Sequence, residues 1–442
     1  MAKSAHSMYN RGYMTQKRHF VLALGDLAML VISLSLMIAI RFGTTYSAPI
    51  VQDHIYAFIP LFILWLVFFY IFNLYDIRNV NPNPRVLGRL VLAVITTNII
   101  GGFFFYLQPS LGITPKTNLL IVSSFAFLLL ILWRRMFYFL FASMFSRRIM
   151  LIGNSTEALE LKAHIEQQKP LGTIVSHKQS ISDVTDEEWT RAIDVVITEA
   201  VDPHTLVELE KKIDARVIML VDAYSELFAK IPLSLMTDER AAHIAIRAHS
   251  YQYAFITRVL EICISSVVLI IFSPIILIVG LIKKIEDGGT MFVPHHMRVG
   301  KNGGPFHLYK MRSMVMNAEK AGVQWAEKND ARITRFGKII RTLHIDEIPQ
   351  LWNVLRGDMA LVGPRPERPE FVTELEQQIP YYFLRHTIKP GFTGWAQIKF
   401  RYARSVEDSK QKLEYDLYYL ENRTPFLDLG IVFKTIQIIF TH

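Results

Sequence analysis

The sequence predicts a membrane protein that joins membrane-inserted helices to an α/β region and a mainly helical C-terminal domain. Three observations lead to this prediction. The 442-residue chain is 51% hydrophobic yet 20% charged, which combines features of membrane and water-facing proteins. Four apolar runs fill its first third, and a strand–helix alternation begins after Arg148. A fifth apolar run then precedes a polar segment rich in motifs, and the length suffices for two or three folded units.

The four N-terminal runs cover residues 20–40, 55–74, 90–107 and 117–133. Each is close to the ~20 residues that a helix needs to cross a bilayer. Their flanks carry four, one, three, one and four Lys or Arg residues in chain order. This alternation predicts a four-helix transmembrane domain, residues 1–146, with both ends in the cytoplasm. Asp26 lies within the first run near its basic flank, so we expect a helix-packing or interfacial role for it.

Residues 147–245 alternate between short apolar runs and helical patterns. The stretch "IMLIGNSTEALELKAHI" indicates a buried strand, a glycine turn and a helix, and "AIDVVITEA" and "ARVIMLVDA" indicate two further strands. This pattern predicts a small parallel-sheet domain. Gly153 stands without the other glycines of a dinucleotide-binding fingerprint. We therefore expect a scaffolding or oligomerising domain, and a homodimer.

The fifth apolar run, residues 256–284, is long enough to span a membrane but has Ser273-Pro274 at its middle. Proline removes a backbone hydrogen bond and kinks a helix. A fifth crossing would place the C-terminal segment on the side opposite to the residues before it. The sequence therefore predicts a re-entrant helix that enters and returns at Ser273-Pro274. The alternative is an ordinary kinked span.

Composition narrows the classes of partner. Cys263 is the single cysteine, so an intrachain disulfide and a cysteine-rich metal site are excluded. The net charge of +9 suits anionic lipid and phosphorylated substrates. Nucleic acid is not an expected partner, because no compact basic motif with interleaved aromatic residues is present.

The C-terminal segment combines cations with an acidic pair. Arg365 lies between two prolines in a stiff loop, and such a guanidinium suits bidentate phosphate recognition. Lys310 and Arg312 fall on one side if their segment is extended. Asp346-Glu347 lie in the same region, where one carboxylate suits attack on phosphorus and the other suits Mg²⁺ or a proton. Acids beside cationic loops are what phosphoryl transfer requires.

Four motifs together are more specific than any single residue. They are "DEIPQLWNVLRGDMALVGPRPERPEF", "KPGFTGWAQ", "PFHLYKMRSM" and "KLEYDLYYL". The motif that begins at Pro305 comes first along the chain, and those that begin at Asp346, Lys389 and Lys412 follow. In that chain order the four motifs resemble the bacterial sugar transferase family of polyprenyl-phosphate phosphoglycosyl transferases, over residues 255–442. The four N-terminal helices and a Rossmann-like middle domain resemble its large monotopic members, and the motif variants resemble its exopolysaccharide branch.

The resemblance implies a reaction and roles for site residues. Asp346 would be the nucleophile that attacks a UDP-sugar and releases UMP, and undecaprenyl phosphate would then accept the sugar phosphate. This is the first membrane step of exopolysaccharide, capsule or O-antigen synthesis. Asp346 and Glu347 would hold Mg²⁺. Lys310, Arg312 and Arg365 would bind phosphate.

Further implications concern location and the remaining site residue. Gln397 would contribute to substrate binding. The Ser-Pro break of the family corresponds to Ser273-Pro274. The catalytic domain, residues 246–442, would be mainly helical and would face the cytoplasm from the bacterial inner membrane, in contact with membrane lipids.

Two alternatives remain at this level. A non-catalytic scaffold of a polysaccharide assembly complex would share the fold, although the presence of Asp346, Glu347, Arg312 and Arg365 favours an enzyme. A conventional glycosyltransferase would release UDP and would need an Asp-x-Asp type of metal site, which the sequence does not convincingly offer. We expect glucose or galactose as the transferred sugar, with N-acetylated sugars as further candidates.

Overall fold

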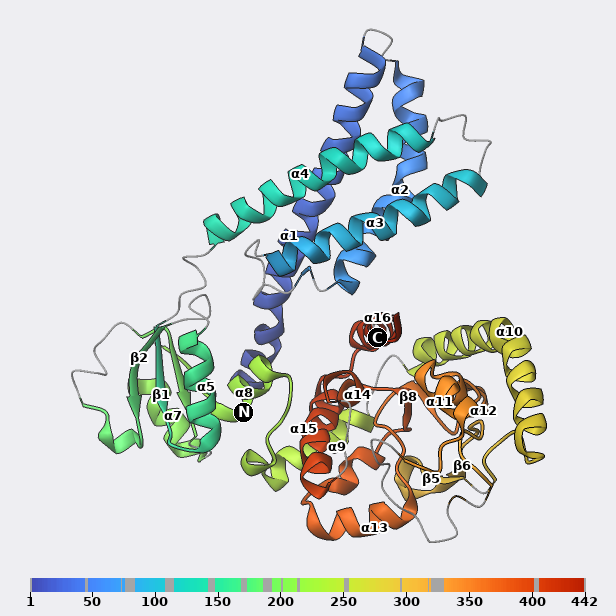
Figure 1. Ribbon diagram of the computed structural model, residues 1–442. Coiled ribbons are helices and arrows are strands. Elements are labelled where there is room, and N and C mark those ends of the chain that lie inside the picture. The colour runs from blue at the N-terminus through green and yellow to red at the C-terminus, as the bar shows by residue number, and fades with distance from the viewer. Residues whose placement is uncertain are drawn as a thin grey trace. The chain divides into compact units, whose positions relative to one another are not determined.

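The fold is known from a computed structural model, which describes residues 2–43, 47–72, 74–75, 84–107, 115–141, 148–167, 173–185, 193–199, 202–212, 215–249, 254–294, 296–316, 318, 330–400 and 405–440 (Figure 1). The chain divides into two compact units. The first contains residues 1–151, 162–196 and 211–216, and the second contains residues 152–161, 197–210 and 217–442. All site residues predicted above belong to the second unit.

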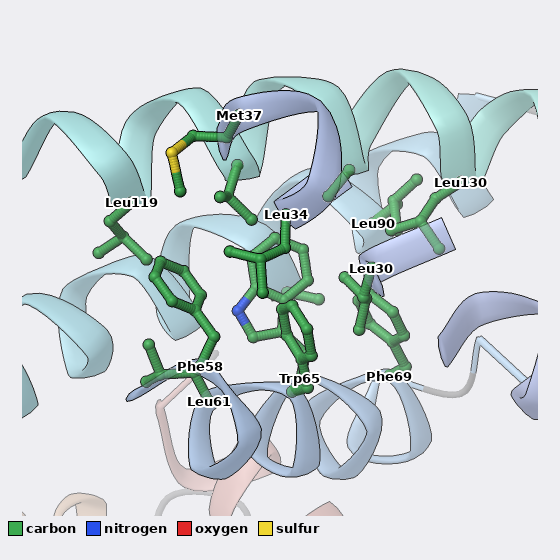
Figure 2. Packing of buried hydrophobic residues seen from close by; sticks show 14 of the residues in the cluster. Leu30, Leu34, Met37, Phe58, Leu61, Trp65, Phe69, Leu90, Leu119 and Leu130 are labelled. Atoms are coloured by element: carbon green, nitrogen blue, oxygen red, sulfur yellow. The ribbon is translucent and has the colours of Figure 1, made fainter. Parts of the chain in front are cut away.

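Four long helices begin the first unit: α1 (Ala2–Phe42), α2 (Ala48–Ile71), α3 (Pro84–Leu107) and α4 (Pro115–Phe141). Proline starts α3 and α4, which costs little because the first helical turn leaves its N–H groups unpaired. Figure 2 shows the core between these helices, where Leu30, Leu34 and Met37 of α1 meet Phe58, Trp65 and Phe69 of α2, Leu90 of α3 and Leu119 and Leu130 of α4. Outward-facing apolar side chains, such as Phe103 and Phe139, remain exposed and suit contact with lipid.

Five helices among the described residues are long and apolar enough to cross a membrane. They are Phe20–Phe42, Ala48–Ile71, Val86–Tyr106, Thr117–Leu140 and Ala254–Glu286. The second begins at Ala48 rather than at Ile55, because Ser47 and Pro49 start the helix ahead of the apolar run. The five apolar segments predicted from the sequence are therefore helices.

A buried ion pair joins α1 to α4. Arg134 Nη2 lies 2.6 Å from Asp26 Oδ2, and neither side chain is more than 1% exposed. Arg134 Nη1 also donates to the Leu74 carbonyl. Beside the pair, Trp133 fills the space above Gly25, where a Cβ would lie 2.0 Å from the indole ring. Asp26 thus contributes to helix packing, in agreement with the role expected from its position.

The α/β region contains β1 (Arg148–Ile152), α5 (Thr156–Gln167), β2 (Thr173–Lys178), η5 (Ile181–Asp183), β3 (Val195–Thr198), α7 (Pro203–Lys212) and β4 (Arg216–Met219). The four strands form one sheet in the order β2-β1-β3-β4. Strands and helices alternate as predicted. The boundary predicted at residues 146 and 147 lies outside the described residues.

The side chain of Glu199 fills the turn that follows β1. Gly153 has a φ of 145°, and a Cβ there would lie 2.3 Å from Glu199 Cδ. The Glu199 carboxylate accepts a hydrogen bond from the Ser155 backbone N–H at 2.8 Å. A carboxylate therefore lies at the start of α5, where a nucleotide-binding domain of this type places phosphate. This arrangement is in keeping with a scaffolding role, which stays a prediction.

The next segment comprises α8 (Leu220–Phe228), η6 (Leu233–Leu235) and α9 (Asp238–His249). Its apolar residues Ile231 and Ile244 share a core with Leu413 and Leu417 of the C-terminal helices. Arg240 of α9 pairs with Asp222 and Glu421 at 3.0 and 2.9 Å. The boundary predicted between residues 245 and 246 falls inside α9.

The C-terminal body is mainly helical. It contains α10 (Ala254–Asp287), β5 (Met297–Val299), η7 (Lys301–Gly303), β6 (Pro305–His307), α11 (Arg335–Thr342), η8 (Ile345–Glu347), α12 (Gln350–Arg356), β7 (Ala360–Val362), α13 (Pro369–Gln378), η9 (Tyr382–His386), β8 (Gly391–Thr393), α14 (Trp395–Lys399), α15 (Val406–Asn422) and α16 (Pro425–Phe440). β5 and β6 pair antiparallel, whereas β7 and β8 pair parallel.

The helix α10 bends into two arms, shown in yellow in Figure 1, and contains Pro274. Near its start, Arg258 donates to the carbonyls of Val354 and Leu355, which end α12. Near its end, Lys283 Nζ donates to Thr334 Oγ1 at 3.0 Å. Both ends of α10 are therefore fastened to the same body.

Candidate active site

The acidic pair lies in η8, a single turn between α11 and α12. His344 precedes it with a left-handed backbone (φ 55°), which redirects the chain after α11. Ile345 packs against the apolar cluster around Met311 and Ile340. The Asp346 carbonyl accepts a hydrogen bond from the Met311 N–H at 2.9 Å. Asp346 is 2% exposed. The hydrogen bond from Met311 and the packing of Ile345 fix the backbone that carries this buried carboxyl group.

One ammonium group bridges the two acids. Lys310 Nζ lies 3.2 Å from Asp346 Oδ2 and 2.9 Å from Glu347 Oε1. The segment that carries Lys310 is fixed by Asn353 of α12, whose amide group accepts from the Tyr309 N–H and donates to the His307 carbonyl. Asn353 is fully buried. It therefore aligns the lysine with the acids, a role that the sequence alone did not reveal.

The guanidinium group of Arg365 contacts both carboxylate oxygens of Glu347. Its Nη2 lies 2.5 Å from Glu347 Oε1, and its Nη1 donates to Oε2 at 3.4 Å. The neighbouring loop depends on two glycines in close contact. A Cβ on Gly391 would lie 2.0 Å from the Gly363 nitrogen. Gly391 also donates to the Pro364 carbonyl at 2.8 Å, so strand pairing sets the course of the loop into Arg365.

The two carboxyl groups experience opposite electrostatic environments. Burial raises the pKa of Asp346, although the Lys310 charge opposes this effect. Burial also acts to raise the pKa of Glu347, but Arg365 and Lys310 outweigh it and hold that pKa well below its usual range. The surrounding cations thus favour the ionised form of Glu347, whereas burial favours the protonated form of Asp346. Such divergence is typical of acidic pairs with separate chemical roles.

Arg312 is placed differently from the other predicted cations. It is buried, and its Nε donates to the Thr290 carbonyl at 2.8 Å. Its Nη1 donates to the Met314 carbonyl at 3.3 Å. A Cβ on Gly289 would lie 2.5 Å from Arg312 Nη2. These contacts let Arg312 organise the backbone behind the acidic turn, and its contact with phosphate stays a prediction.

Gln397 lies on α14, which follows β8. Its Nε2 donates to the Phe392 carbonyl at 3.4 Å. Its Oε1 is buried and accepts no hydrogen bond from the residues that the structure describes. A buried acceptor of this kind usually has a partner, so a donor group on a bound substrate would satisfy it.

Arg341 is a further cation near the acids. It lies in the last turn of α11, and its charge lowers the pKa of Asp346. Its Nη1 is buried and makes no hydrogen bond within the described ranges. In the sequence Arg341 follows three other cations, Arg332, Arg335 and Lys338, and nothing in the pattern distinguishes it from them. The one signal in the sequence that could have identified Arg341 as a site residue was its short distance from Asp346 along the chain.

The C-terminal body matches a known family. The model for "Bacterial sugar transferase" matches residues 252–442. A UDP-N-acetylgalactosamine-undecaprenyl-phosphate N-acetylgalactosaminephosphotransferase of Aeromonas hydrophila is 46% identical over 43% of this chain and 44% of its own length. A UDP-glucose:undecaprenyl-phosphate glucose-1-phosphate transferase of Klebsiella pneumoniae is 38% identical over 40% of this chain and 39% of its own length.

A shorter relative decides the family. A putative undecaprenyl-phosphate N-acetylgalactosaminyl 1-phosphate transferase of Bacillus subtilis is 46% identical over 30% of this chain, which covers 74% of that relative. The chain belongs to the bacterial sugar transferase family. The match spans less than half the length of the Aeromonas and Klebsiella relatives, 44% and 39%.

The acidic pair of this sugar transferase offers two carboxylate groups as ligands for a metal ion. Among the described residues, no group of three or more His, Cys, Asp or Glu side chains gathers to hold a metal ion. Mg²⁺ needs only one or two protein carboxylates when substrate phosphates and water complete its shell. Asp346 and Glu347 supply two such carboxylates, which Lys310 and Arg365 contact in this structure. The binding of Mg²⁺ there together with a diphosphate stays a prediction.

We predict that Lys310→Met raises the pKa of Asp346 further. The Lys310 charge opposes the effect of burial on this carboxyl group, so its removal extends the protonated form to higher pH. Infrared difference spectra over a pH series measure the change, with Asp346→Asn identifying the band. Lys338→Met, which changes an exposed lysine, should leave the band unchanged. An unchanged or lower Asp346 pKa in Lys310→Met would contradict the prediction.

Proposed function

We propose that this sugar transferase transfers a sugar 1-phosphate from a UDP-sugar to undecaprenyl phosphate and releases UMP. The observation that carries the proposal is the buried carboxyl group of Asp346, placed beside an ionised Glu347, with Lys310 and Arg365 on the pair. The names of the Aeromonas, Klebsiella and Bacillus relatives support the same reaction. The product would start exopolysaccharide, capsule or O-antigen synthesis.

In the first step, an Asp346 carboxylate oxygen bonds to the β-phosphorus of the UDP-sugar. The bond from that phosphorus to the oxygen shared with the α-phosphate breaks, and its electron pair leaves with UMP. In the second step, a phosphate oxygen of undecaprenyl phosphate attacks the same phosphorus and displaces the carboxylate. Each step exchanges one P–O bond for another, as a covalent displacement requires.

The surrounding cations address the main obstacle, which is repulsion between the carboxylate and the diphosphate. Lys310 favours the ionised form of Asp346 that attacks. Arg365 presents a planar guanidinium that suits phosphate oxygens, and Arg341 adds a buried donor that makes no hydrogen bond with the described residues. Mg²⁺ held by Asp346 and Glu347 would neutralise diphosphate charge when bound. Bound charges of this kind stabilise developing negative charge in a site from which water is excluded.

We propose in addition that α10 is re-entrant and that the catalytic body faces the cytoplasm of the bacterial inner membrane. Two observations support this topology. Arg258 and Lys283, near opposite ends of α10, are fastened to one body. The positive-inside pattern also returns the chain to the cytoplasm after α4. The homodimer expected from the middle domain stays a prediction.

The proposed reaction predicts that UMP is the nucleotide product. Protein in lipid nanodiscs, supplied with Mg²⁺, undecaprenyl phosphate and single UDP-sugars, should release UMP with one donor of the panel. The panel includes UDP-glucose, UDP-galactose and UDP-N-acetylgalactosamine, because the relatives carry glucose and N-acetylgalactosamine in their names. Release of UDP would establish conventional glycosyl transfer instead. No nucleotide release across the panel would support the scaffold alternative.

Asp346→Asn should abolish turnover, with a loss of about 10⁴-fold or more, because a carboxamide is not a nucleophile toward phosphorus. Intact-protein mass spectrometry without acceptor should detect a sugar-phosphate adduct on the wild-type chain and none on the variant. Glu376→Gln, which changes an exposed carboxyl group of the same body, serves as the matched control and should retain the adduct. Substantial turnover in Asp346→Asn would remove this residue as the nucleophile.

The re-entrant topology predicts that both flanks of α10 react from the same side. In a Cys263→Ser background, His249→Cys and Lys284→Cys should react with an impermeant thiol reagent only in inside-out vesicles. Ser47→Cys, between α1 and α2, should react only in right-side-out vesicles. Labelling of His249→Cys and Lys284→Cys from opposite sides would establish a fifth crossing. If Pro274→Ala keeps both flanks on the cytoplasmic side, Pro274 is not the cause of the bend.

A further inference from the structure

The helix α15 carries the "KLEYDLYYL" motif, to which the proposed reaction assigns no part. Lys412, Asp416 and Tyr419 lie four and three residues apart, so the helical period places them on one face. All three are buried, with exposures of 8%, 1% and 1%. Charged side chains are rarely buried at this level unless they are paired. Their partners therefore reveal what this face does.

The partners belong to the loop that carries Arg365 and to the helix that follows α13. Lys412 Nζ donates to Glu367 Oε1 at 2.6 Å, two residues beyond Arg365. Asp416 pairs with Arg385 of η9 at 3.0 Å. Arg385 in turn donates through Nη2 to the Arg365 carbonyl at 3.0 Å. Two charged groups of α15 are thus connected to this loop, Lys412 through the Glu367 side chain and Asp416 through Arg385, which donates to the Arg365 carbonyl.

Further contacts fix the same loop at Val362, Pro366 and Glu367. Tyr419 Oη lies 3.3 Å from the Val362 carbonyl and donates to Asp428 at 2.6 Å. The Pro366 carbonyl accepts from Arg298 at 3.3 Å. The Glu367 carbonyl accepts from the Val299 N–H at 2.9 Å. The backbone from Val362 to Glu367 therefore has little freedom to shift.

Stability alone is a weak explanation for this charge network. Buried ion pairs often contribute little net stability, because desolvation offsets their attraction. The pairing is nevertheless strong here: burial raises the pKa of Glu367, but Lys412, Arg385 and Arg298 outweigh it and hold that pKa at about 2. Apolar residues would fill the same space without this desolvation cost. Directional contacts, in contrast, fix the position of a loop.

We propose that Lys412 and Asp416 of α15 are positioning residues that hold the Arg365 guanidinium in line with the acidic pair through Glu367 and Arg385. This proposal rests on the proposed function for its catalytic part. The two-pronged contact of Arg365 with Glu347 requires the loop backbone in one place, and the contacts of α15 through Glu367 and Arg385 hold that backbone. A displacement of about 1 Å in such a group can cost about a hundredfold in rate.

The test combines a structural and a kinetic readout on the full chain in nanodiscs. Lys412→Met removes the charge and keeps the length of the side chain. Lys410→Met is the matched control, since this lysine lies on the same helix with its side chain 45% exposed. Hydrogen exchange of the peptide 360–368 reports on the loop. Single-turnover UMP release, measured in wild-type and Arg365→Ala backgrounds, reports on catalysis and forms a double-mutant cycle.

We expect Lys412→Met to speed exchange in residues 360–368 and to lower the rate by about tenfold to a hundredfold. In the Arg365→Ala background the same change should cost less than about threefold, because its effect acts through Arg365. Lys412→Arg should restore most of the rate, and Lys410→Met should change neither readout. If Lys412→Met does not fold, Asp416→Asn, which keeps an oxygen acceptor for Arg385, carries the same expectations.

Equal losses in both backgrounds would overturn the positioning role, because they would show an effect independent of Arg365. Unchanged exchange in residues 360–368 would overturn it as well. Absence of UMP from the wild-type chain would overturn the proposed function instead. In that case the exchange result alone would decide whether α15 holds the loop.

Discussion

The carboxylate of Glu347, shared between Arg365 and Lys310, is the interaction on which the rest of the site depends. It joins three segments that are distant in sequence: the acidic turn, the proline-bounded loop and the strand extension that carries Lys310. Each of these segments is fixed separately by backbone contacts. Because Glu347 is committed to two cations, its neighbour Asp346 is left as the carboxyl group with adjustable charge. Adjacent acids of the same chemistry thereby acquire different tasks.

The close approach of backbone at Gly363 and Gly391 gives this arrangement its rigidity. Side chains at these positions would separate β7 from β8, and the loop into Arg365 would lose its reference strand. Charged groups also hold this loop: Arg385 donates to the Arg365 carbonyl, and Lys412 donates to the Glu367 carboxylate. The apolar core beneath them supplies most of the stability. Polar contacts supply direction, which a core of aliphatic residues lacks.

Much of this organisation was readable from the sequence. The apolar runs predicted the helices, because length and hydropathy are properties of a continuous segment. Asp346, Glu347 and Arg365 were found because they stand in short, unusual strings. Asn353 and Arg341 were missed, since an asparagine or arginine within a helix looks the same whether it faces solvent or the site. Arg312 was predicted to bind phosphate, which stays a prediction, and its guanidinium contacts carbonyl groups that only the fold brings near it. Pairings such as Lys412 with Glu367 join residues 45 positions apart, beyond any local pattern.

In the re-entrant topology proposed above, the two anchored ends of α10 would set the height of the acidic pair above the bilayer. Arg258 and Lys283 tie both arms to the body that contains the acidic turn, and apolar side chains such as Ile270 and Ile271 remain exposed between them. Burial of those side chains in lipid fixes how deeply the body sinks. With the proposed substrates, a lipid-linked phosphate at the headgroup level and a nucleotide dissolved in water would then meet at a constant height above the membrane. The catalytic groups would need no movement along the membrane normal to reach both substrates.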